Sequence, residues 1–198
     1  MNSNAMQRAD FAAIANWIKS GARVLDLGCG DGSLLRFLAE QRDAIGYGVE
    51  IEDDGVLACA TNGVNVIQGD MERGLSAFAD DSFDYVILSQ TLQAVRSSER
   101  VVREILRVGR EGIVTFPNFG YWRNRLQVMC GNMPVSDNLP YSWFDTPNIH
   151  LCTITDFENF CHDHGVNILE RIVMRNGRPV TMLPNLLGSL AVYRFERG

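Results

Sequence analysis

Three glycines at alternate positions, Gly28, Gly30 and Gly32, separate a short apolar stretch from a helical pattern that begins near Ser33. Glycines placed directly after a first strand let the chain turn sharply and let a ligand approach the bare backbone. A loop of this kind favours a nucleoside cofactor at the end of a buried strand. The alternative interpretation is an ordinary strand-to-helix turn in which the glycines serve geometry alone.

Strand-like and helix-like apolar patterns alternate on both sides of this loop. Helical stripes open with Phe11, Leu34, Val56 and Val101. Buried strands are predicted, in chain order, over residues 23–27, 45–49, 64–67, 85–88 and 112–116. Alternation at this spacing indicates a parallel, doubly wound sheet with helices on both faces, and right-handed crossovers fix most of its topology.

The chain changes character after the fifth predicted strand. Residues 117–148 are rich in aromatic residues, proline and asparagine, and we expect a long irregular insertion there with one short helix over 121–130. The pattern Thr155-Asp156-Phe157-Glu158 then predicts a capping box at the start of a helix that closes at Gly165.

The end of the chain completes the predicted sheet. Two strands, near residues 168–174 and 190–195, are expected to form an antiparallel pair. The predicted fold is therefore α/β, with a Rossmann-like, doubly wound and mainly parallel sheet of seven strands. A length of 198 residues suits one domain, over residues 6–198, better than two. We expect residues 1–5 to be a remnant of an expression vector and Met6 to be the natural start.

Composition narrows the function classes. The formal net charge of -6 argues against a nucleic-acid partner, because phosphate neutralisation needs a concentrated basic surface. No apolar stretch approaches the about 20 residues of a membrane-spanning helix, and no signal-peptide pattern opens the chain. The five scattered cysteines fit buried thiols in a reducing compartment better than a disulfide framework. We therefore expect a cytoplasmic protein without a membrane partner.

The spacing of the glycine loop indicates the cofactor. A dinucleotide site normally spaces its glycines G-x-G-x-x-G, because the pyrophosphate sits on the helix N-terminus. Here the spacing is G-x-G-x-G, and Asp26 places a carboxylate two residues before Gly28. A negative charge at this point suits the cationic end of S-adenosylmethionine better than a pyrophosphate. A nicotinamide-dependent oxidoreductase is therefore disfavoured.

Further polar residues follow the second, third and fourth predicted strands. Glu50, next to Ile51, stands about 20 residues beyond the glycines, where an acid can accept both ribose hydroxyls. Gly69-Asp70-Met71 follows the third strand, where Asp70 can accept from the adenine amino group while Met71 packs on the ring. Ser89-Gln90 ends the fourth strand and points at the same crevice. Taken singly, Glu50 is also interpretable as a solvated carboxylate and Gly69-Asp70 as a plain turn.

These segments together resemble class I S-adenosylmethionine-dependent methyltransferases, and more closely the MetW family of methionine biosynthesis. The resemblance covers nearly the whole chain from about Met6. The glycine loop is shared by many methyltransferases. Phe116-Pro117-Asn118-Phe119 also matches the family, and more specific are Gln90-Thr91-Leu92-Gln93 and Pro147-Asn148-Ile149-His150.

The resemblance implies a cofactor, a set of contacts and a partner. It assigns Asp26, Gly28 and Gly30, with their loop neighbours Cys29 and Gly32, to the methionine part of S-adenosylmethionine or S-adenosylhomocysteine. It assigns Glu50 to the ribose and Asp70 with Met71 to the adenine. MetW-like proteins are associated with homoserine O-acyltransferase, which is therefore the expected partner.

No catalytic residue is assigned from the sequence. Methyl transfer from a sulfonium is an in-line displacement, so positioning and exclusion of water supply most of the catalysis. His150, Tyr121 and Tyr141 are candidates for a general base, but His150 is also interpretable as a hydrogen-bonded core residue. Cys161 and His164 fall on the buried stripe of a capped helix, so no metal site is expected.

Two function classes remain open. In the first, the chain methylates a small molecule, with an acceptor pocket shaped by Phe119, Tyr121, Trp122 and Trp143. In the second, it is a weakly catalytic or non-catalytic partner of homoserine O-acyltransferase, and the cofactor signals the output of the pathway. An exposed apolar patch on the insertion, in place of a closed pocket, would favour the second class.

Overall fold

The computed structural model describes residues 3–198, with side chains from Ala9 onward. The vector remnant expected at residues 1–5 lies partly outside the described residues. The helices are α1 (Ser3–Trp17), α2 (Ser33–Arg42), α3 (Asp53–Thr61), α4 (Ser98–Val108), α5 (Trp122–Met129), α6 (Ile154–Asp163) and α7 (Pro184–Leu187), with 3-10 turns η1 (Met71–Arg73) and η2 (Leu92–Ala94). The strands are β1 (Arg23–Leu27), β2 (Ile45–Glu50), β3 (Asn65–Gln68), β4 (Phe83–Ser89), β5 (Gly109–Pro117), β6 (Val166–Arg175), β7 (Arg178–Pro179) and β8 (Leu190–Arg197).

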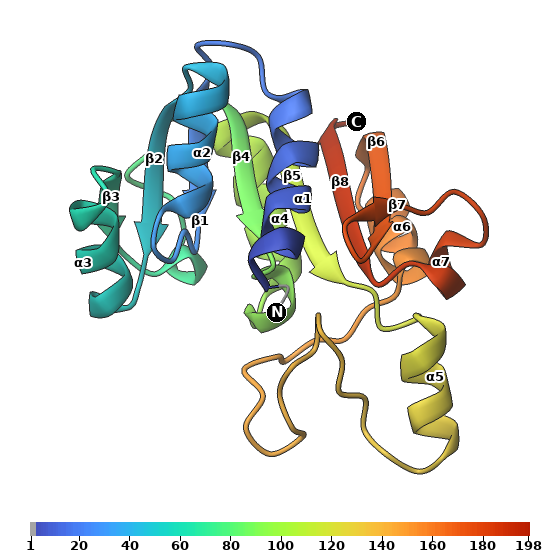
Figure 1. The fold of residues 1–198 in the computed structure, drawn as a ribbon. Helices are drawn as coiled ribbons and strands as arrows, with labels where there is room; N and C mark the ends of the chain where they lie inside the picture. The colour runs from blue at the N-terminus through green and yellow to red at the C-terminus, as the bar shows by residue number, and fades with distance from the viewer. Residues whose placement is uncertain (1–2) are drawn as a thin grey trace.

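The strands form one mixed sheet in the order β3-β2-β1-β4-β5-β8-β6-β7 (Figure 1). Strands β1 to β5 pair in parallel, and β8 joins β5 and β6 in antiparallel register. The predicted doubly wound sheet with an antiparallel pair at its end is therefore confirmed. From β1 the chain continues outward to β2 and β3, and from β4 it continues outward to β5 on the other side. The topological switch point therefore lies between β1 and β4.

One short strand goes beyond the seven that were predicted. Strand β7 pairs with the end of β6 across the turn at Asn176 and Gly177. Both turn residues have positive φ angles, 50° and 72°, which suits a tight hairpin and explains the asparagine and glycine there.

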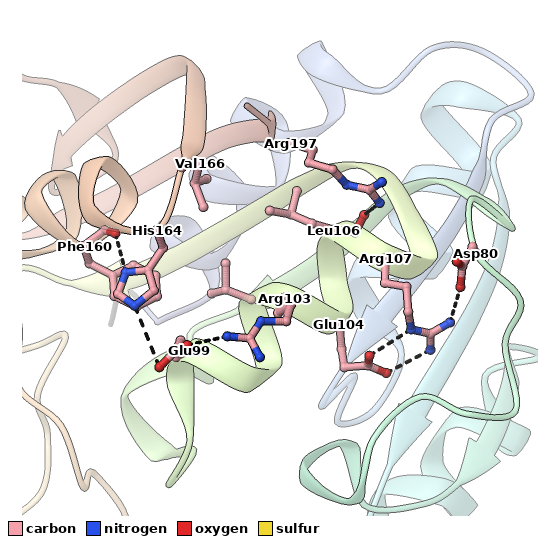
Figure 2. Close-up of a pocket in the computed structure, with 12 residues that line it drawn as sticks. Asp80, Glu99, Arg103, Glu104, Leu106, Arg107, Phe160, His164, Val166 and Arg197 are labelled. Atoms are coloured by element: carbon pink, nitrogen blue, oxygen red, sulfur yellow. Dashed lines mark hydrogen bonds and ion pairs between the residues drawn. The ribbon is translucent and has the colours of Figure 1, made fainter.

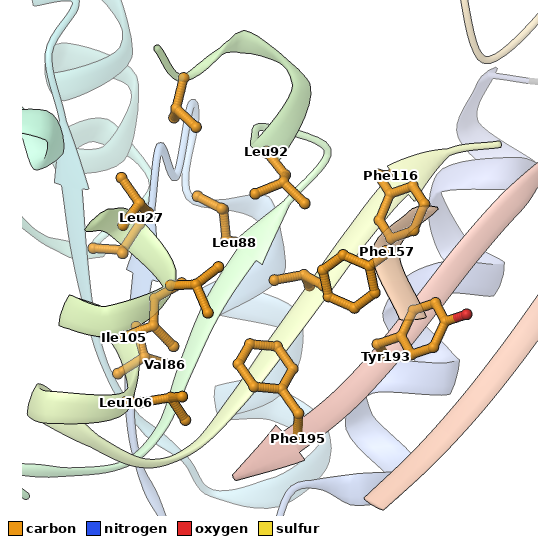
Figure 3. Packing of buried hydrophobic residues seen from close by; sticks show 14 of the residues in the cluster. Leu27, Val86, Leu88, Leu92, Ile105, Leu106, Phe116, Phe157, Tyr193 and Phe195 are labelled. Atoms are coloured by element: carbon orange, nitrogen blue, oxygen red, sulfur yellow. The ribbon is translucent and has the colours of Figure 1, made fainter. Parts of the chain in front are cut away.

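Helices cover both faces of the sheet, and each face has its own apolar core. Helices α4 and α6 bury Ile105 and Phe157 on one face, while α1 and α2 bury Ile14 and Leu38 on the other. The core under α6 is aromatic (Figure 3): the Phe157 ring lies 5.0 Å from that of Phe116 and 4.7 Å from that of Tyr193. Truncating a ring buried in this way typically costs about 3–5 kcal/mol.

The capping box of α6 lies two residues before the predicted one. Thr153 is the N-cap, its Oγ1 accepts from the Asp156 N–H at 3.2 Å, and the Asp156 carboxylate accepts from the Thr153 N–H at 2.9 Å. The prediction at Thr155 and Glu158 is wrong, because the same spacing of residue types occurs twice in this stretch. The earlier start buries Ile154 on the inner face of the helix.

His164 is also placed differently from the prediction. It is the C-cap residue of α6 and is exposed, with its ring stacked 4.3 Å from that of Phe160. Only Cys161 of the expected pair faces the core. The stripe ends one turn earlier than expected because the helix itself ends at Asp163.

Residues 121–151 form an arm between β5 and α6. It is largely irregular and contains one short helix, in agreement with the predicted insertion. Helix α5 lies in this arm, and a bridge between Ser136 and Leu139 closes one turn of it. The arm projects from one end of the molecule, away from the sheet (Figure 1). Within residues 3–198, no helix combines the length and the apolar character that crossing a membrane requires.

Candidate functional site

A buried carboxyl group without a partner stands at the switch point. Asp26 lies near the carboxyl end of β1, is 2% exposed, and its Oδ1 has no hydrogen-bond partner within the described residues. Burial first, and the Glu50 carboxylate second, raise the pKa of Asp26 from 3.8 to about 8. An unpaired buried polar atom is costly, so this group is suited to a ligand that donates to it or carries positive charge.

The glycine loop follows directly. The N–H groups of Gly28 and Cys29 donate to the Val49 carbonyl at 2.8 and 3.2 Å, which fixes the loop against the end of β2. All three glycines have positive φ, 70° at Gly28, 55° at Gly30 and 74° at Gly32, a conformation that L side chains rarely adopt. A Cβ on Gly30 would meet nothing within 4 Å, so the backbone is open to a ligand there.

Glu50 ties the loop to the second strand. Its Oε2 accepts from the Gly30 N–H at 2.8 Å, and its Oε1 accepts from the N–H groups of Ile51 and Glu52 at 2.8 and 3.0 Å. A carboxylate offers about four lone-pair sites. Oε2 therefore keeps one free site, which is enough for one ligand hydroxyl in this arrangement.

The three predicted residues that follow the third strand differ in how they relate to the site. Gly69 donates to the Glu50 carbonyl at 2.9 Å, which draws the segment against β2. The Met71 side chain reaches the glycine loop, since its Cε would lie 3.2 Å from a Cβ on Gly28. Asp70 is engaged locally: its Oδ1 accepts from the Glu72 N–H at 2.9 Å and caps η1.

The end of β4 contributes strained backbone. Gln90 has φ 51°, and its N–H donates to the carbonyl and the Oγ1 of Thr115 at 3.0 and 2.9 Å. Ser89 Oγ lies 3.3 Å from the same hydroxyl. Thr91 completes this edge, because its side chain would lie 3.1 Å from a Cβ on Gly28. Non-glycine residues at positive φ concentrate at functional sites, where strain of about 1–3 kcal/mol is held by the surroundings.

The opening helix supplies a residue that sequence reasoning missed. Asp10 of α1 is 1% exposed, and Gln90 Nε2 donates to its Oδ2 at 3.1 Å. Burial outweighs this hydrogen bond and raises the pKa of Asp10 from 3.8 to about 6. The available signal was an acidic residue directly before the apolar stripe that begins at Phe11.

Three predicted residues take part through the backbone or through packing only. The Cys29 side chain turns away from the loop opening, with its Sγ 3.6 Å from that of Cys59, and both thiols are buried. A Cβ on Gly32 would lie 2.9 Å from Val64, so this glycine serves close packing. The Ile51 side chain is exposed at the start of α3.

The candidates for a general base and an acceptor pocket do not converge. His150 is exposed, so its interpretation as a core residue is wrong, and its Nε2 lies 3.2 Å from the Arg96 carbonyl oxygen. Tyr141 and Trp143 are also exposed on the arm, whereas Tyr121 is buried and packs against Trp122. Within residues 3–198 no group of three or more histidine, cysteine or acidic side chains is arranged to hold a metal ion.

The segments that carry the more specific part of the sequence resemblance contact each other. The N–H groups of Ile149 and His150 both donate to the Gln93 carbonyl, at 2.8 and 2.9 Å. Gln93 Nε2 in turn donates to the Gln90 carbonyl at 2.6 Å. The arm is therefore joined to the same β4 end that borders the switch point.

A separate hollow of about 380 Å³ lies between α4 and α6 (Figure 2). Most of its charged side chains are paired with one another: Arg107 with Asp80 and Glu104, and Glu99 with Arg103. Arg197 also lines the hollow and donates to the Leu106 carbonyl. Val102 and Leu106 give it an apolar floor. Because most of these charges are neutralised in pairs, the hollow offers less to a small polar ligand than Asp26 does, whose Oδ1 has no partner within the described residues.

Comparison with known sequences identifies relatives over nearly the whole chain. Residues 8–195 match the family model described as methionine biosynthesis protein MetW. The chain is 38% identical over 202 residues to the bifunctional methionine biosynthesis protein MetXA/MetW of Rhodopirellula baltica. That match covers 95% of this chain but 32% of the relative, so the chain spans about a third of the length of the curated relative that it matches.

Solved structures share the fold. An S-adenosylmethionine-dependent methyltransferase from Mesorhizobium loti superposes with a TM-score of 0.70 at 16% identity, covering 96% of this chain and 98% of that one. The cyclase SpnF superposes with a TM-score of 0.68 at 18% identity, covering 98% of this chain and 81% of that one. The fold is thus that of S-adenosylmethionine-dependent methyltransferases, and a cyclase among its neighbours illustrates that the fold alone does not fix the reaction.

Proposed function

The chain belongs to the MetW family of methionine biosynthesis proteins, and from that premise we propose that it binds S-adenosylmethionine at the switch point and acts with a homoserine O-acyltransferase. The observation that carries the cofactor is Asp26, a buried carboxyl group whose Oδ1 has no partner among the residues that the structure describes. A ligand with an ammonium group and a sulfonium supplies the positive charge and the donors that this carboxyl lacks.

The residues around Asp26 fit the rest of this cofactor. The open backbone at Gly30 would admit the methionine part, with Gly28, Cys29 and Gly32 shaping the turn. Glu50 Oε2 would accept one ribose hydroxyl, and Met71 would pack on the adenine. Ile51, Gly69, Asp70, Ser89 and Gln90 would complete the border of this proposed site.

S-adenosylmethionine supplies an electrophilic methyl group when it is bound. Among the residues beside the proposed site, Asp10 is the candidate proton acceptor. Burial raises its pKa to about 6, and a general base works best when its pKa lies near the operating pH. Its contact with Gln90 places it beside the proposed site. This observation favours a second candidate function, methyl transfer to a small-molecule acceptor without a partner protein.

The partnership with homoserine O-acyltransferase has support of a different kind. In the Rhodopirellula baltica relative, the names MetXA and MetW describe a single bifunctional chain. A fusion keeps two activities at a high effective concentration, which is useful when the two parts work together. The exposed aromatic side chains of the arm point in the same direction.

The cofactor proposal is tested by the thermal stability of three proteins with and without S-adenosylmethionine. Wild type is expected to melt at a higher temperature with the cofactor, since a ligand that binds only the folded state stabilises it. Asp26→Asn is expected to lose this rise. Asp31→Asn is the matched control, because it changes an exposed acid of the same loop and asparagine keeps a side-chain oxygen that can accept from the Ser33 N–H. An equal rise in all three proteins would contradict the role of Asp26.

A further inference from the structure

The arm, residues 121–151, exposes many large apolar side chains. Its exposed large side chains are Leu126, Val128, Met129, Met133, Val135, Tyr141, Trp143, Phe144, Ile149 and Leu151. Trp143 is 74% exposed, Phe144 73% and Met129 81%. Contiguous exposed apolar surface marks a site of interaction, whereas single exposed apolar residues do not.

The scarcity of charged side chains on the arm favours a protein partner over a membrane or a nucleic acid. Between residues 126 and 149 the only charged side chains are Asp137 and Asp145, and the two arginines of the arm, Arg123 and Arg125, lie in the first turn of α5. Surfaces that bind membranes or nucleic acids use clusters of basic residues. A surface with aromatic residues and methionine and few charges matches the buried centre of protein–protein interfaces.

The root of the arm is firmly fixed to the body. Asn118, 1% exposed, donates from Nδ2 to the carbonyls of Asn185 and Gly188 at 3.0 and 2.8 Å. Its Oδ1 accepts from the N–H groups of Gly120 and Ile154 at 3.0 and 3.3 Å. One buried amide therefore joins the entry to the arm, its exit and the segment before β8. The two ends of the arm are therefore fixed to the body by hydrogen bonds, and the exposed apolar side chains lie between them.

We propose, on the basis of the proposed function, that the arm is the surface on which homoserine O-acyltransferase docks. The fused relative supports this occupant over a second copy of the chain, because there the two parts named in the chain are held together covalently. The arm, residues 121–151, is also long enough to supply the about 20–30 residues that each side of a stable interface contributes.

This position of the arm links the docking surface to the cofactor site. Gln93 accepts from the returning end of the arm at Ile149 and His150, and its side chain holds the carbonyl of Gln90. Cofactor and acyltransferase would thus contact two ends of one hydrogen-bonded segment. By linkage, any effect of the cofactor on acyltransferase affinity must equal the effect of the acyltransferase on cofactor affinity.

The test compares two double variants that remove exposed apolar side chains. Trp143→Ser with Phe144→Ser changes the arm. Leu57→Ser with Ile67→Ser is the matched control on α3 and β3, outside the arm. Binding of each full-length protein to purified homoserine O-acyltransferase of the same organism is measured by biolayer interferometry. The arm variant is expected to bind about 30-fold or more weakly, because buried aromatic residues dominate interface energies. The control is expected to bind like wild type.

The outcomes separate this inference from the function on which it rests. Unchanged affinity of the arm variant, with wild type binding, would overturn the docking surface and leave the partnership intact. Absence of binding by wild type would instead refute the partnership itself. A wild-type dimer that the arm variant dissociates, seen by light scattering, would assign the arm to a second copy. Met129→Ser on α5 provides an independent arm variant, and unchanged melting temperatures exclude misfolding as the cause of lost binding.

Discussion

Asp26→Asn should make the ligand-free protein more stable while it removes cofactor binding. The carboxyl of Asp26 is buried, no side chain or backbone group in the described part of the chain hydrogen-bonds to its Oδ1, and its pKa is raised from 3.8 to about 8. Folded protein therefore keeps a proton on this group that the unfolded chain releases above about pH 4. Between these two values the folded state binds more protons, so the free energy of unfolding falls as pH rises.

The size of this stability difference follows from the distance between the two pKa values of Asp26, in the unfolded and the folded protein. Each tenfold change in an equilibrium constant corresponds to about 1.4 kcal/mol, so a pKa displaced from 3.8 to about 8 amounts to at most on the order of 6 kcal/mol. Asparagine has nearly the same shape as aspartic acid and does not ionise. The stability of Asp26→Asn relative to wild type should therefore be small at pH 4 and grow steadily up to pH 8.

Urea denaturation of both proteins at several pH values between 4 and 8, without cofactor, measures this difference directly. Asp31→Asn is again the control: hydrogen bonding from Ser33 lowers the pKa of Asp31, so its removal leaves the slope above pH 5 unchanged. Parallel stability profiles for Asp26→Asn and wild type would refute the reasoning, because they would mean that Asp26 is ionised in the folded protein at little cost.

Substitutions at four further positions test single contacts. Glu50→Ala should weaken cofactor binding by at least 1–3 kcal/mol and also lower stability, since three backbone N–H groups lose their acceptor; calorimetry and urea denaturation measure the two effects, and unchanged affinity would rule out a ribose contact. Asp70→Ala should weaken cofactor binding by about 1–3 kcal/mol. Asp70→Asn should keep the hydrogen bond that caps η1 and lose only the carboxylate charge. If both variants bind the cofactor with wild-type affinity, Asp70 is not part of the site. Thr153→Ala should lower stability by about 1 kcal/mol and Thr155→Ala by less, because Thr153 is the N-cap of α6; the reverse order in thermal unfolding would restore the capping box predicted from sequence.

The sheet was predictable because its signals are local and repeated. The bounds predicted for the first strand coincide with those of β1, and Ser33 begins α2 as expected. Buried strands of a parallel sheet are nearly continuous apolar runs, and glycines mark the turns that follow them. Each of these features can be read within a window of a few residues.

The errors arose where distant contacts decide between equivalent local patterns. Two stretches near α6 carry a capping-box spacing, and the burial of Ile154 against the body selects the first. His150 follows an apolar residue, yet it is exposed on the arm, where its N–H donates to the Gln93 carbonyl. Asp10 was missed because its partner, Gln90, is 80 positions away in the sequence.

The candidate site shows the same division. The strand ends that carry Asp26, Glu50 and Met71 were predictable from topology, since parallel strands present their carboxyl ends at one edge. The direction of each side chain was not. Cys29 points away from the loop opening, and Asp70 caps a 3-10 turn, because neighbouring residues offer those polar and thiol groups nearer partners.

The measurement that tests the central claim most directly is calorimetric titration of the wild-type protein with S-adenosylmethionine near neutral pH. The proposed site predicts saturable binding of one cofactor per chain, with S-adenosylhomocysteine competing and Asp26→Asn abolishing the heat. Absence of heat, together with an unchanged melting temperature at the highest cofactor concentration, would contradict the claim and leave the fold without its proposed ligand.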